Sequence, residues 1–144
     1  MTYKLLAAIA LALTTVAPAA FAGECEDNFS KSGSIFSGTD FSSRITVPDL
    51  SVKDEMGQMR GIMIAEKMDV ITEDAETGTM LVEQRSTNTT RAIPTLIAIS
   101  AEGGAATVQM TVKTEKGQMA KQDAIRPYMC QLLAKVKGGK EGRA

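Results

Sequence analysis

The most specific chemistry in this 144-residue chain belongs to its two cysteines. Cys25 and Cys130 are its only cysteines, and no histidine lies near them to complete a zinc-type site. In an oxidising compartment such an even pair predicts a disulfide, here closing a loop of about 100 residues. The alternative is a reactive thiol, but the chain contains no histidine that would activate one. A disulfide is therefore the favoured interpretation.

Methionines form the second group with a possible chemistry. Met56, Met59, Met63 and Met68 follow one another at spacings of three to five residues, and thioethers are ligands of Cu(I). The same residues would form the apolar stripe of a helix, which favours packing in the core. A carrier of Cu(I) or of a small ligand, using Met56, Met59 and Met63, is the alternative function.

The remaining chemistry is mostly excluded by residue type. Without histidine there is no Ser-His or Cys-His unit and no imidazole base near neutral pH. Catalysis by two convergent carboxylates stays open, but tryptophan, a usual sugar platform, is absent. Asp74 and Glu76 resemble a calcium loop, yet the distal glutamate of an EF-hand is missing, so a hairpin tip is favoured. The sequence predicts a protein that is not an enzyme and needs no cofactor.

The first 22 residues have the three parts of a secretory signal peptide. Lys4 gives a basic start, residues 5–16 are apolar, and Ala20-Phe21-Ala22 matches the cleavage pattern, so the mature chain should begin at Gly23. The apolar run is shorter than the roughly 20 residues that span a bilayer. Glu24 precedes Cys25, which argues against a lipoprotein. We expect a periplasmic or secreted protein that is not membrane-anchored after cleavage.

Charge limits the choice of partners. Lys4 is the only charged residue of the leader, and the whole chain has 16 basic and 17 acidic residues. The mature net charge is therefore about −2, which argues against a nucleic-acid partner. The basic residues near the C-terminus are flanked by glycines and favour a solvated tail.

The sequence divides into four regions: a cleaved leader (1–22), a Ser- and Gly-rich strap without regular structure (23–43), an α+β domain (44–137) and a flexible basic tail (138–144). Phe29, Ile35 and Phe36 lie in the strap at irregular spacing. Exposed aromatics in an exported protein favour a partner-binding role. The alternative is that these three side chains pack on the domain's own core.

Periodicity predicts a strand at 44–47, a helix at 51–67 capped by Ser51, strands at 68–72, 79–84, 94–100 and 106–114, and a last helix carrying Ile125 to Val136. Pro127 must lie in the first turn of that helix or kink it. The expected fold is a two-layer α+β domain, with an antiparallel sheet of four to five strands and two helices on one face.

The order of these elements carries a resemblance. A capped helix, a strand, an acidic turn ending at Gly78 and a return strand occur within residues 41–133. This region resembles the small helix-grip-like domains of bacterial envelope proteins, such as those of the outer-membrane assembly lipoprotein BamC. The resemblance implies a non-enzymatic binding or assembly part and assigns no functional residue.

We therefore expect a non-catalytic binding or accessory protein that acts on another envelope protein. An assembly adapter and an inhibitor or immunity-type factor both fit this description, and the sequence does not separate them.

Overall fold

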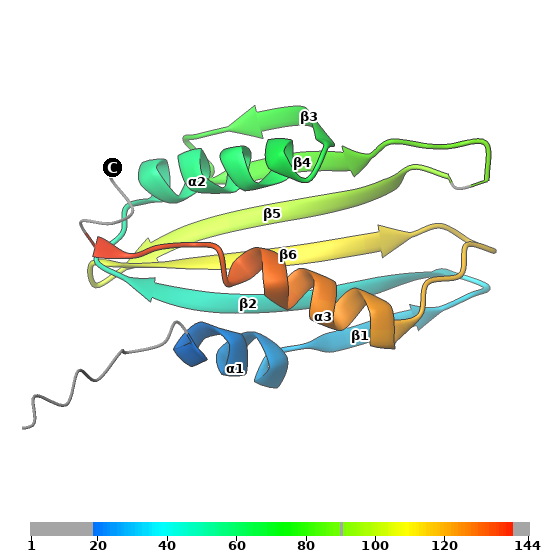
Figure 1. Cartoon of the computed structure of the whole chain (residues 1–144), viewed down its shortest axis with the longest axis horizontal. Coiled ribbons are helices and arrows are strands. Elements are labelled where there is room, and N and C mark those ends of the chain that lie inside the picture. Colours follow the sequence, from blue (N-terminus) through cyan, green and yellow to red (C-terminus); the bar gives the residue numbers. More distant parts are fainter. Residues whose placement is uncertain (1–18, 90, 140–144) are drawn as a thin grey trace, which may run out of the picture.

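The computed structural model describes residues 19–89 and 91–139, which form one antiparallel sheet and three helices (Figure 1). The elements in chain order are α1 (Ala19–Asp27), β1 (Ser30–Ser34), β2 (Gly38–Pro48), α2 (Val52–Ala65), β3 (Met68–Asp74), β4 (Thr79–Gln84), β5 (Ile93–Glu102), β6 (Ala105–Thr114) and α3 (Gln122–Leu133). The expected α+β class is confirmed. The sheet has six strands, so the expected number of four to five was too low.

The strands are ordered β1-β2-β6-β5-β4-β3, and every neighbouring pair is antiparallel. The helices lie over one face of this sheet (Figure 1). Along β6, Val108, Met110 and Val112 are buried, whereas Gln109 and Lys113 are exposed. One face of the sheet is therefore packed and the other is polar, as the alternation predicted.

The capped helix forms where the sequence placed it. The hydroxyl of Ser51 accepts a hydrogen bond from the Asp54 amide at 3.1 Å, which satisfies one of the free N–H groups at the start of α2. The helix ends before Lys67, which has a positive φ of 61°. The predicted helix of 51–67 was thus correct to within two residues at its end.

The segment before β2 is the main correction to the predicted fold. Residues 23–43 were expected to lack regular structure, but they contain most of α1, all of β1 and the start of β2, which begins at Gly38 rather than Arg44. β1 has the sequence SKSGS, whose composition does not favour a strand. It is a strand because the short turn at 35–37 folds it back onto β2.

α1 covers the part of the β2 edge that β1 leaves unpaired. β1 pairs with residues 38–42 of β2 only. Beyond them, the Glu24 carboxylate accepts from the Thr46 amide at 3.0 Å, and the Asn28 amide donates to the Arg44 carbonyl at 3.2 Å. The side chains of Glu24 in α1 and of Asn28 directly after it thus take the place of a neighbouring strand. The other edge of the sheet, β3, carries a bulge at Ile71, which also discourages pairing.

The last helix contains a proline beyond its first turn. Pro127 is the sixth residue of α3, so it lies within the helix rather than at its start. The buried residues of α3 include Met129, Leu132 and Leu133, as the apolar pattern predicted. Within the described part of the chain, no helix has the length and hydrophobicity needed to cross a bilayer.

Candidate functional site

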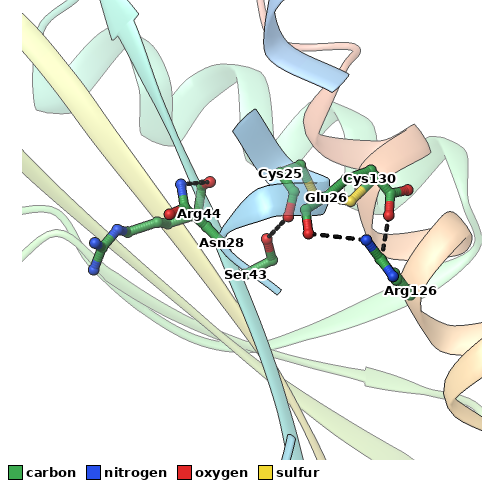
Figure 2. The surroundings of a disulfide bond; sticks show 7 residues. All are labelled: Cys25, Glu26, Asn28, Ser43, Arg44, Arg126 and Cys130. Carbon is green, nitrogen blue, oxygen red and sulfur yellow. Dashed lines mark hydrogen bonds and ion pairs between the residues drawn. A yellow bond between two sulfur atoms is a disulfide. The ribbon is translucent and has the colours of Figure 1, made fainter. Parts of the chain in front are cut away.

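The predicted disulfide is present and joins the two ends of the described chain. Cys25 on α1 and Cys130 on α3 are bonded, with their Cα atoms 5.6 Å apart and a sequence separation of 105 (Figure 2). The Cys25 carbonyl accepts from the Ser43 hydroxyl at 2.5 Å, and Arg126 forms an ion pair with Glu26. The bond and its neighbours fasten α1 to both β2 and α3.

The structure separates the three aromatic and aliphatic residues suggested as a partner-binding set. Phe29 packs against the core, with its ring centroid 6.3 Å from that of Phe41 and the Arg126 guanidinium over its face. Ile35 and Phe36 lie in the β1–β2 turn instead, and Phe36 is 80% exposed. Only the last two are available to a partner.

A residue that sequence reasoning missed lies beside them. Met119, in the connection between β6 and α3, is 79% exposed. The Gly117 amide donates to the Ile35 carbonyl at 2.8 Å, so this connection is bonded to the β1–β2 turn. No periodic pattern in residues 115–121 points to Met119. An apolar residue in a polar loop was the only signal.

We call Ile35, Phe36 and Met119 together the end surface, because both connections lie at the same end of the sheet (Figure 1). A shallow pocket of about 390 Å³ adjoins it. The pocket is lined by Lys31, Gly33, Ser34, Ile35, Thr39, Gln118, Met119 and Ala120. The end surface therefore combines protruding apolar side chains with an open recess.

Lysines lie on the same elements as the end surface, and one of them, Lys31, lines the adjoining pocket. Lys31 lies 5.8 Å from the Phe41 ring centroid, and Lys116 and Lys121 flank Met119 in the connection to α3. Among the ion pairs of the described residues, none involves these three lysines. The nearest acidic residue in that connection, Glu115, pairs with Arg91. The local charge is therefore positive on a chain whose net charge is negative.

The methionine stripe of α2 faces the core. Met56, Met59 and Met63 have exposed fractions of 2%, 0% and 0%. They lie in one apolar cluster with Met80, Met110 and Met129 from the sheet and α3. Their flexible side chains fill the layer between helix and sheet. This position favours a role in core packing over a role in carrying a metal.

Replacing Met59 and Met63 together by leucine is expected to leave the fold intact. Leucine conserves volume and apolar character, so each change costs less than about 1.5 kcal/mol. Denaturant unfolding measures this cost, and a Cu(I) competition titration of both proteins measures metal affinity. Submicromolar Cu(I) binding by the parent protein that disappears in this variant would support the carrier instead.

The acidic turn after β3 is organised by its own backbone. Asp74 Oδ1 accepts from the amides of Glu76 and Thr77 at 2.9 and 3.2 Å. These hydrogen bonds hold the pKa of Asp74 below its usual value. Glu73 forms an ion pair with Arg60 of α2. Within residues 19–89 and 91–139, no group of three or more His, Cys, Asp or Glu side chains could hold a metal ion.

A buried carboxylate on α2 is the second feature that the sequence did not indicate. Glu55 is fully buried, and neither of its carboxylate oxygens has a hydrogen-bond partner among the described residues. Burial raises the pKa of Glu55 from 4.5 to about 7. Such a group costs stability, so its presence calls for a physical explanation.

Comparison with protein-family models and with curated protein sequences finds no significant match to this chain.

Proposed function

We propose that the chain is an exported, non-catalytic binding protein of the cell envelope that acts on another envelope protein through the end surface. The observation that carries the proposal is the exposure of Phe36 and Met119, at 80% and 79%, on two connections that are bonded to each other. Large apolar side chains clustered on a surface mark interaction sites.

The leader-like sequence and the disulfide support export. A disulfide persists in oxidising compartments such as the periplasm. The packing of helices on one face of an antiparallel sheet is compatible with the resemblance to helix-grip-like envelope domains. That resemblance, and the choice between an assembly adapter and an inhibitor or immunity-type factor, belong to the proposal.

The end surface also specifies the chemistry of a suitable partner. Aromatic residues and methionine dominate the centre of protein interfaces, and charged residues form the rim. Here Phe36 and Met119 would form the centre, and Lys31, Lys116 and Lys121 the rim. The matching surface is an apolar recess bordered by acidic side chains.

Replacing Phe36 by alanine is expected to spare stability and to abolish partner capture. A side chain that is 80% exposed contributes little to the core, so the free energy of unfolding should change by less than about 1 kcal/mol. A photo-crosslinking amino acid at position 119 in intact cells should give a discrete protein adduct in the parent, and this adduct should be lost in F36A.

Ile71→Ala is the matched control, because Ile71 is 49% exposed on the opposite edge of the sheet. It should leave the adduct unchanged. An adduct that persists in F36A, or that is lost equally in I71A, would contradict a role for the end surface.

A further inference from the structure

The residues that follow α3 contact α2. We call residues 134–139 the C-terminal segment. The Gln58 side chain forms two hydrogen bonds with the backbone of Lys137 in this segment. The side-chain amide of Gln58 donates to the Lys137 carbonyl at 2.7 Å, and the side-chain carbonyl of Gln58 accepts from the Lys137 amide at 2.8 Å. Lys135 forms an ion pair with Glu66, the C-cap residue of α2.

The segment continues toward the start of α2. The Gly139 amide donates to the Asp49 carbonyl at 3.0 Å, two residues before the Ser51 cap. Gly138 lies so close to β2 that a Cβ atom would approach the Pro48 carbonyl oxygen to 2.6 Å. Figure 1 shows the segment leaving α3 toward the end of the sheet where α2 begins.

Glu55 lies between these two attachment points. It precedes Gln58 by three residues, and residues three apart share one face of a helix. The C-terminal segment contacts Gln58 on that face and then reaches Asp49, so it passes over the turn that carries Glu55. Val136, at the centre of the segment, is 3% exposed. The segment therefore runs beside the turn of α2 that carries the buried Glu55.

We propose that the C-terminal segment is a pH-dependent cover, which stays closed while Glu55 is protonated and opens when Glu55 loses its proton. A carboxylate ion without a hydrogen-bond partner is strongly disfavoured in a buried site. Opening the segment exposes Glu55 to water, so ionisation and opening favour each other.

The charged groups around Glu55 do not provide an alternative partner. On the C-terminal segment, Lys135 is paired with Glu66 and Lys137 is exposed. On the sheet side, the buried residues of β5 and β6 are uncharged. From the helix and the preceding link, Asp54 bonds with the Ser51 hydroxyl and Asp49 is exposed. Burial is the sole cause of the raised pKa of Glu55, with no contribution from a neighbouring charge.

Amide hydrogen exchange tests the cover, with the Lys137 and Gly139 amides as reporters. Protection is compared at pH 5 and pH 8 after correction for intrinsic exchange. A carboxyl whose pKa is about 7 when covered and 4.5 when open shifts the opening equilibrium by roughly 50- to 100-fold over this interval. The chain has no histidine, the side chain that ordinarily titrates in this range.

Two variants isolate the cause. Glu55→Gln keeps the shape of the side chain but cannot ionise, so the pH dependence at both reporters should disappear. Gln58→Ala removes the attachment but keeps Glu55, so it should raise exchange by a similar factor at both pH values and preserve the dependence. A shift below about 3-fold in the parent or the same shift in E55Q would overturn the proposal. So would protection at the two reporters that equals that of the slow amides of β5 and β6 at both pH values, because the reporters would then exchange only by global unfolding.

Discussion

Replacing Cys25 and Cys130 together by alanine is expected to lower the free energy of unfolding by about 4 kcal/mol. The bond closes a loop across a separation of 105 residues, and in the chain-entropy model a loop of about 100 residues contributes about 4.7 kcal/mol by restricting the unfolded chain. Denaturant unfolding of the variant measures the loss, and reducing the parent protein with dithiothreitol should reproduce it.

Ser43→Ala provides a matched control for this effect. It removes the hydrogen bond from the Ser43 hydroxyl to the Cys25 carbonyl but leaves the disulfide in place. Loss of one such bond costs about 1 kcal/mol, which is well below the effect of opening the loop. The prediction is wrong if reduction and S43A lower the free energy of unfolding by the same amount.

The second large effect concerns the dependence of stability on pH. The pKa of Glu55 is about 7 in the folded protein against a usual value of 4.5. Between these values the folded state binds more protons than the unfolded state, so stability must fall as the pH rises from 4.5 to 7. The expected loss is up to about 3 kcal/mol, from 1.36 kcal/mol for each unit of pKa shift.

Glu55→Gln should remove this loss. The variant is expected to match the parent near pH 4 and to exceed its unfolding free energy by up to about 3 kcal/mol at pH 8. Glu76→Gln is the control, because Glu76 is exposed in the turn after β3 and should leave the pH profile unchanged. A parent protein that is equally stable at pH 4.5 and pH 8 would contradict the buried, unpaired state of Glu55.

Local signals were sufficient to predict the central part of the fold. The Ser51 cap and the methionine spacing defined α2, and alternation along β6 identified its buried face. Both hairpins were placed within about two residues of their bounds, because a polar turn and two glycines mark where the chain reverses. The disulfide followed from the even number of cysteines, the export expected from the leader and the absence of histidine.

The first elements could not be predicted because tertiary contacts stabilise them. The α1 helix is held by the disulfide and by side-chain bonds to the β2 edge, and β1 depends on pairing with β2. Neither set of contacts has a local sequence pattern. The burial of Glu55 was missed for a related reason: a glutamate in the first turn of a helix is usually a favourable, exposed neighbour of the helix dipole. The burial of this one depends on tertiary packing, which leaves no local pattern in the sequence.

The position of α1 on the β2 edge has a consequence for biosynthesis. An open sheet edge is a template on which another chain can add a strand, and so a starting point for aggregation. The bond that fastens α1 requires Cys130, which lies 105 positions after Cys25 and is therefore synthesised much later. During synthesis α1 therefore stays unfastened until the chain has been made as far as Cys130. The rate of oxidation then decides how long each new molecule is prone to aggregate.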